Sequence, residues 1–104
     1  MSRRSARLPA AMTPKSLRPK NSAALNGLGL YNLYRGSSKD AEANFRTAIE
    51  ADRSNLAAYN NLAVALERQN KVTEAVAVLE QALKIKPDFE DARKNLDRLK
   101  ATGG

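Results

Sequence analysis

The chain has 104 residues, a formal net charge of +7, and neither cysteine nor histidine. These absences exclude disulfide bonds, zinc sites built on cysteine or histidine, and catalysis by a thiol or an imidazole. No apolar run approaches the ~20 residues that a membrane-spanning helix needs, and the scarcity of aromatic residues favours a core of closely packed helices.

The positive charge is concentrated in the first part of the chain. Residues 1–39 contain eight basic and no acidic residues, whereas residues 40–104 contain ten basic and eleven acidic residues. The high overall charge is therefore no evidence that the whole protein binds nucleic acid, because the larger part of the chain is nearly neutral.

Residues 1–21 are predicted to form an irregular tail that is disordered on its own. Pro9, Pro14 and Pro19 interrupt a regular helix, and apolar side chains are too few to offset the entropy of ordering. Four roles remain open for the tail: docking into a complex, targeting, binding nucleic acid or a membrane, or no role at all. Its basic residues are Arg3, Arg4, Arg7, Lys15, Arg18 and Lys20.

The first helix is predicted from Asn21, with Asn21 or Ser22 as its N-cap. Apolar residues at spacings of three and four give this helix a broad apolar face. Gly36 is expected to end it, because glycine accepts the left-handed backbone that commonly follows a last helical turn.

Three further helices are predicted, separated by short turns. Ser37 and the acid three residues later resemble a capping box at the start of the second helix, and Asn55 or the serine before it is placed to cap the third. Asn70 is expected to end the third helix and Pro87 the fourth. Turns this short force neighbouring helices to run antiparallel, which gives two helical hairpins.

A fifth helix over residues 90–101 is predicted to close the array. Leu96 and Leu99 form one narrow apolar stripe, and most of the remaining positions are charged. The terminal unit of a stacked array needs such a polar outer face.

The sequence nearly repeats itself every 34 residues. A fixed period of this length predicts stacked supersecondary units rather than one closed core. We assign the repeated small and apolar residues to the core, with Gly29 and Ala63 where paired helices cross closely. The coinciding positions are Ala24–Ala58–Ala92, Leu28–Leu62–Leu96, Gly29–Ala63, Ala41–Ala75, Phe45–Leu79, Ala48–Ala82 and Ile49–Leu83.

These residues resemble the tetratricopeptide repeat family, whose pattern has Leu-Gly in the first helix, Ala, Phe and Ala in the second, and Pro at the end. Asn32 and Arg53 depart from it, because the family usually has tyrosine and proline at these positions. The resemblance implies an all-α fold: an α-solenoid of two antiparallel helical hairpins plus a closing helix. The implied domain spans residues 22–104, with repeats at 22–55 and 56–89 and the capping helix at 90–101.

The resemblance also implies a binding site. Members of the family usually bind a peptide segment in a concave groove that is lined by the first helix of each repeat. An alternative for Leu30 and Leu33 is packing against the tail or an adjoining subunit. The positions that correspond to the groove are Asn26, Leu30, Leu33, Tyr34, Asn60, Val64, Arg68, Lys94 and Arg98.

One edge of the predicted array lacks a polar ending. Two repeats are fewer than the ~3 that a stable stack normally needs, and Leu25, Leu30 and Tyr31 leave part of the first hairpin apolar. We expect this edge to be covered by the tail, by a second copy of the chain or by a partner.

We therefore predict a non-catalytic protein–protein interaction module: an adaptor, scaffold, assembly factor or accessory subunit that binds a peptide segment or subunit of a complex through the groove and the basic tail. Acidic residues lie where helix capping and solubility explain them, so no catalytic residue, metal site or cofactor is predicted. The alternative is a basic nucleic-acid-associated protein that uses the repeats to dimerise. The expected location is soluble, either cytoplasmic or organellar if the tail is a targeting segment.

Overall fold

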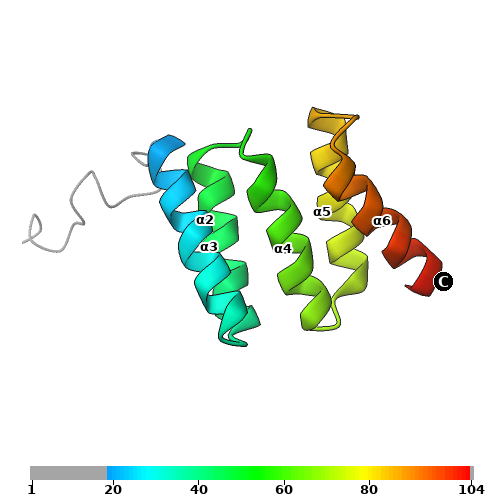
Figure 1. Cartoon of the computed structure of the whole chain (residues 1–104), viewed down its shortest axis with the longest axis horizontal. Helices are drawn as coiled ribbons and strands as arrows, with labels where there is room; N and C mark the ends of the chain where they lie inside the picture. Colours follow the sequence, from blue (N-terminus) through cyan, green and yellow to red (C-terminus); the bar gives the residue numbers. More distant parts are fainter. Residues whose placement is uncertain (1–18, 104) are drawn as a thin grey trace, which may run out of the picture.

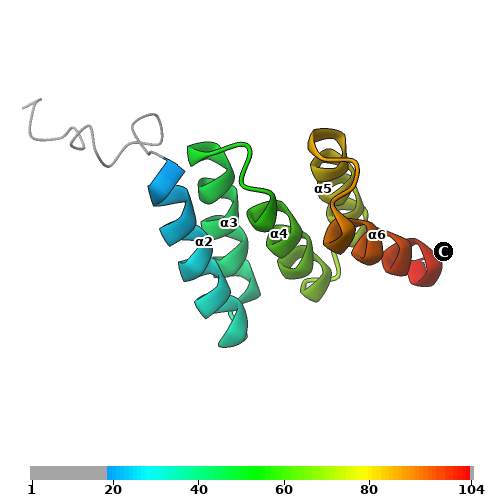
Figure 2. The same ribbon diagram turned by 45° about the horizontal axis from the view of Figure 1, so that its top comes forward.

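The computed structural model describes residues 19–103, and these form five α-helices in two layers. The layer of α2, α4 and α6 packs against the layer of α3 and α5 (Figures 1 and 2). Each helix contacts the next along the chain, and α2 also contacts α4. The helices are α2 (Pro19–Tyr34), α3 (Ser38–Ala51), α4 (Leu56–Arg68), α5 (Val72–Ile85) and α6 (Glu90–Gly103). The predicted all-α solenoid of two hairpins and a closing helix is confirmed.

The first helix begins at Pro19 instead of Asn21. Proline is well accepted in the first turn of a helix, because the N–H that it lacks would have no helical partner there. Asn21 and Ser22 therefore lie inside the helix, and the prediction that one of them caps it is wrong. Lys20 lies in α2, whereas the other basic residues of the predicted tail, Arg3, Arg4, Arg7, Lys15 and Arg18, lie outside the described residues.

Gly36 and Asn70 end the first helix of each hairpin, as predicted. Both adopt the left-handed backbone, with φ of 86° and 64°. The carbonyl oxygens that the last helical turn leaves free are satisfied by backbone N–H groups beyond that turn. The equivalent bonds are Ser37 N–H to Asn32 O at 2.8 Å and Lys71 N–H to Leu66 O at 2.9 Å.

The two predicted caps have different outcomes. The side chain of Asn55 accepts a hydrogen bond from the N–H of Ala58 at 3.3 Å and so caps α4. Ser37 occupies the N-cap position of α3, but its side chain makes no capping bond, and the predicted capping box with Asp40 is wrong. The backbone of Ser37 (φ −91°, ψ 67°) is close to that of the capping Asn55 (φ −78°, ψ 84°), so the two N-caps differ in the side-chain hydrogen bond and not in the backbone conformation.

Inside each hairpin, a small residue on the first helix is paired with a larger residue on the second helix. A Cβ atom on Gly29 would overlap the ring of Phe45, with Cδ1 only 2.6 Å away, so glycine lets this ring lie against the backbone of α2. At the equivalent positions of the second hairpin, Ala63 accompanies the smaller Leu79, and both are buried. The predicted close crossing at Gly29 is confirmed.

A polar pair joins the helices of the first hairpin where the second has an apolar contact. The Nδ2 group of Asn32 donates to Oδ1 of Asn44 at 2.6 Å. The residues 34 positions later are Leu66 and Val78, which belong to the hydrophobic core or pack against it. The unusual Asn32 is therefore accommodated by a partner on α3.

Ser22 is the one buried polar residue identified among the described residues. Its hydroxyl donates to the carbonyl oxygen of Ala48 at 2.7 Å and accepts from Nδ2 of Asn55 at 2.8 Å. Because Asn55 also caps α4, this hydroxyl ties the start of α2 to the end of α3 and the start of α4.

Leu28 does not occupy the core position that the repeat predicts for it. Its exposed fraction is 47%, whereas the equivalent Leu62 and Leu96 are 2% and 4% exposed. The side chain types agree, but none of the described helices precedes α2 to cover this side of it (Figure 1).

Replacing Ser22 by alanine should lower the free energy of unfolding by ~1–3 kcal/mol, because a carbonyl and an amide lose a buried partner. Urea denaturation followed by circular dichroism measures this change. The Ser37→Ala variant is the control, and it should change stability by less than ~0.5 kcal/mol because no side-chain capping bond is lost. Equal effects of the two substitutions would contradict the role assigned to Ser22.

Two glycines of α2 should respond oppositely to alanine. Gly29→Ala should destabilise the fold by ~1–3 kcal/mol, because the new methyl group overlaps Phe45. Gly27→Ala meets no atom within 4 Å and should stabilise the helix by ~0.5–1 kcal/mol. Thermal denaturation of both variants tests the close crossing, which would be refuted if Gly29→Ala were the more stable of the two.

Candidate functional site

The predicted groove residues all lie on α2, α4 and α6, which share one layer of the stack. We call the surface they form the inner face. The 34-residue register places side chains from the three helices in rows across this face. The rows are Asn26–Asn60–Lys94, Leu30–Val64–Arg98 and Tyr34–Arg68.

Two asparagine pairs link the helices of the inner face. Nδ2 of Asn61 donates to Oδ1 of Asn26 at 3.0 Å, and Nδ2 of Asn95 donates to Oδ1 of Asn60 at 2.8 Å. Each pair uses one donor and one acceptor, so Nδ2 of Asn26 and Nδ2 of Asn60 keep hydrogen-bonding capacity for another molecule. Sequence reasoning did not include Asn61 and Asn95 in the site, although their recurrence 35 residues after Asn26 and Asn60 was a usable signal.

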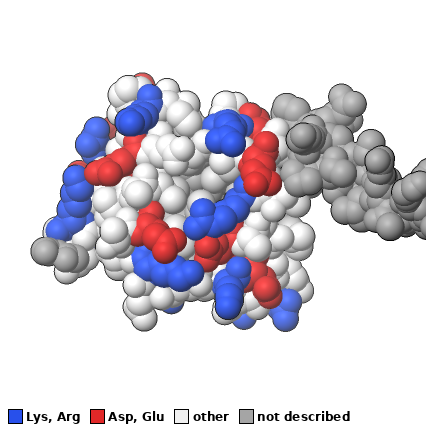
Figure 3. All heavy atoms as spheres, turned by 180° about the vertical axis from the view of Figure 1, so that it is seen from behind, with Lys and Arg blue, Asp and Glu red and all other residues white. Residues whose placement is uncertain are grey.

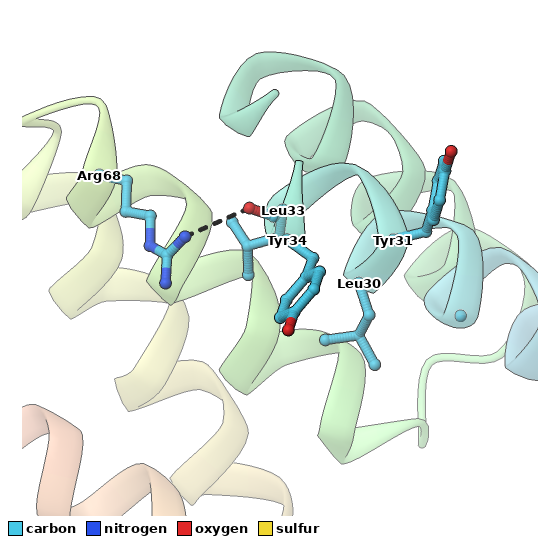
Figure 4. A pocket seen from close by; sticks show the side chains of 6 residues that line it. Leu30, Tyr31, Leu33, Tyr34 and Arg68 are labelled. Atoms are coloured by element: carbon cyan, nitrogen blue, oxygen red, sulfur yellow. Dashed lines mark hydrogen bonds between the residues drawn. The ribbon is translucent and has the colours of Figure 1, made fainter. Parts of the chain in front are cut away.

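An open hollow lies at the end of α2, beside α4 (Figure 4). Leu30 and Tyr34 are exposed by 43% and 92%, whereas Leu33 is only 7% exposed and belongs to the core. Tyr31 points away from these side chains, toward the other side of α2 (Figure 4). The residues that line the hollow are Gly27, Leu30, Tyr31, Leu33, Tyr34 and Arg68.

Arg68 closes one side of this hollow. A terminal nitrogen of its guanidinium donates to the carbonyl oxygen of Leu33 at 3.2 Å (Figure 4). The charge lies near the C-terminal end of α2, where the helix dipole favours a cation. The remaining donors of this guanidinium, which bonds α2 through one of its nitrogens, can meet a ligand.

Arg98 forms an ion pair within the inner face. Its two terminal nitrogens lie 2.7 and 2.9 Å from the carboxylate oxygens of Glu67. The hydrogen bonds from Arg98 lower the pKa of Glu67 below its ordinary value of 4.5, against the opposing effect of burial. Lys94, on the same helix, is exposed and lies in the row of Asn26 and Asn60.

Charges of both signs are interspersed on the face of α3 and α5 (Figure 3). Burial alone would raise the pKa of Glu42, but hydrogen bonds from Gln69 and Arg46 and the charges of Arg46 and Lys71 lower it. Arg46 lies 2.9 Å from Glu42 and 3.5 Å from Glu74, which connects α3 with α5. The described part of this face therefore presents no field of a single sign.

The sequence matches the model of a known protein family. The sequence model described as "Tetratricopeptide repeat" matches residues 26–89, which span both helical hairpins. A search of curated proteins found no match. Among the described residues, no helix is long and apolar enough to cross a membrane, and no group of three or more acidic, histidine or cysteine side chains is placed to hold a metal ion.

The Glu67–Arg98 pair predicts a pH-dependent contribution to stability. Because the folded state lowers the pKa of Glu67, the unfolded chain binds more protons in acid, and the contribution is lost as the pH falls through the lowered folded value. Glu67→Gln should therefore cost up to ~1 kcal/mol at pH 7, a small amount because the pair is partly exposed, and nothing at pH ~2. Urea denaturation of both proteins across this range measures the difference, and a difference independent of pH would refute the assignment.

Proposed function

Because the chain belongs to the tetratricopeptide repeat family, whose members generally act in protein–protein interactions, we propose that it is a non-catalytic module that binds a peptide segment or a subunit of a larger complex on its inner face. The observation that carries this proposal is the combination of paired asparagines with an apolar hollow on one continuous surface. An adaptor, an assembly factor or an accessory subunit would each use such a surface.

The asparagine pairs supply the contacts to the main chain of the ligand. Hydrogen bonds to Asn61 and Asn95 hold the amides of Asn26 and Asn60 in fixed orientations, which lowers the entropy lost on binding. An amide has both a donor and an acceptor, as a peptide bond does, so these side chains fit any residue of an extended segment.

The character of the inner face changes from one end to the other. Leu30 and Tyr34 make the α2 end apolar, and the exposed ammonium of Lys94 places a positive charge at the α6 end. The proposed ligand therefore carries an apolar side chain for the hollow and an acidic residue on the side of α6, with its main chain across the asparagines. Leu33 supports this site from the core instead of contacting the ligand openly.

The binding of nucleic acid is the weaker candidate. Its main support is that residues 1–39 contain eight basic and no acidic residues, and five of these basic residues precede the first helix, which begins at Pro19. The face of α3 and α5 mixes both signs of charge (Figure 3), whereas nucleic-acid binding needs a clustered basic surface. Docking of a partner by the basic tail remains part of the proposal.

Selection of displayed random peptides on the full chain tests the proposed site. Peptides that bind should lose affinity by ~5-fold or more for Leu30→Ala and for Tyr34→Ala, because exposed apolar anchors contribute disproportionately to binding. The matched control is Ile85→Ala on α5, where the side chain is 47% exposed compared with 43% for Leu30. Affinities that fall equally for all three variants, or for none, would refute the site.

A further inference from the structure

The outer side of α2 exposes apolar residues that are buried in the rest of the stack. We call Ala24, Leu28, Tyr31 and Arg35 the edge face; they follow one another at helical spacings on a single stripe. Leu28 and Tyr31 are 47% and 59% exposed, and Ala24 is exposed as well. The equivalent positions of α4 and α6 are 0–4% exposed: Ala58, Leu62 and Ala65, and Ala92, Leu96 and Leu99.

The helix that precedes α4 and the helix that precedes α6 explain why the stripe is buried there and exposed on α2. On α4 this stripe is buried where α4 packs against α3, and on α6 it is buried where α6 packs against α5. Within residues 19–103 no helix precedes α2. The edge face therefore has the residue types of a surface that receives an antiparallel helix.

The residues that precede α2 do not have the pattern of such a helix. The apolar positions of α3 are Ala41, Phe45 and Ala48, and the positions one repeat earlier hold Arg7, Ala11 and Pro14. A proline in the third position and a charge in the first are incompatible with the same packing. The sequence of residues 4–17 therefore does not match the apolar pattern of α3.

The charges around the edge face indicate the chemistry of its partner. In the equivalent contact of the second hairpin, Gln69 donates to a carboxylate oxygen of Glu42 on α3 at 2.9 Å. The residue equivalent to Gln69 is Arg35, whose guanidinium lies 5.5 Å from the ring centre of Tyr31. A helix that docks in the same way would place a carboxylate against Arg35, where the pair would be charge-assisted.

A second copy of the chain fits this face less well. Its exposed α2 would bring another segment without acidic residues to Arg35. Its helices α3, α5 and α6 do carry acidic residues, but their apolar residues are already buried within their own stack. We infer that the edge face binds an amphipathic helix of a partner protein, antiparallel to α2, with small and large apolar residues in the pattern of α3 and an acidic residue opposite Arg35. This surface is separate from the inner face, so the two proposals can fail independently.

The probe is a synthetic peptide with the sequence of Ser38–Ala51, SKDAEANFRTAIEA, titrated into the isotope-labelled full chain. An isolated helix of this length is marginal, so concentrations should reach about 2 mM. Backbone amide shifts should move at Leu28, Tyr31 and Arg35 and stay fixed at Asn60. A peptide with Glu42→Lys should bind at least ~3-fold more weakly, because the charge opposite Arg35 is reversed.

A second variant keeps the inference testable if the peptide binds too weakly. Replacing residues 4–17 of the full chain by the same sequence supplies the helix at a high effective concentration. The melting temperature should rise by at least ~4 °C, and Leu28→Asp should remove the gain. The inference is supported if the added peptide shifts the amide signals of the edge face. It is also supported if the replacement of residues 4–17 raises the melting temperature and Leu28→Asp removes that rise.

Three results would overturn it. The first is the absence of both effects. The second is a peptide footprint confined to Asn60 and the rest of the inner face. The third is sedimentation showing that the unmodified chain is a dimer that Leu28→Asp converts to a monomer, since the occupant would then be a second copy.

Discussion

The close approach of α2 and α3 at Gly29 and Phe45 is the contact on which the rest of the arrangement depends. Because glycine has no side chain, the ring lies against the helix backbone, and Ala63 with Leu79 repeats this solution at smaller scale. Two hairpins of similar geometry then stack with their first helices in one layer. That layer brings asparagines from three helices within hydrogen-bonding distance, so the inner face is a consequence of core packing.

A stack of this kind has two ends, and in this chain they expose different residues: α6 exposes charged side chains and α2 exposes apolar ones. The last helix covers its neighbour with Leu96 and Leu99 and turns charged residues outward. The first helix carries no charged residue between Asn21 and Tyr34, and it exposes Leu28 and Tyr31 on one side and Leu30 and Tyr34 on the other. Each unit of a stack contacts only its neighbours, and none of the helices within residues 19–103 precedes α2. The helix proposed to dock on the edge face would take the place of such a neighbour. Both proposed docking surfaces, the inner face and the edge face, therefore include residues of α2.

Local signals in the sequence predicted the five helices and the ends of α2 and α4, because Gly36 and Asn70 act within one turn. They did not predict the start of α2 at Pro19 or the missing side-chain cap at Ser37. The 34-residue register predicted the core residues of α3, α4, α5 and α6, but not the exposure of Ala24 and Leu28 on α2. Burial of Ser22 could not be predicted, since it depends on a carbonyl of α3 and an amide before α4. The exposure of Leu28 was also missed, because its residue type matches its buried equivalents and only the absent neighbour distinguishes it.

The central claim is that partners dock on the two free sides of α2. Photo-crosslinking in the native cell tests it most directly, with a photoreactive phenylalanine analogue placed in turn at Tyr31, Tyr34 and Ile85, three exposed positions. The account predicts protein adducts at Tyr31 on the edge face and at Tyr34 beside the hollow, with background levels at Ile85. Adducts of equal yield at all three positions, or adducts at Ile85 alone, would contradict it.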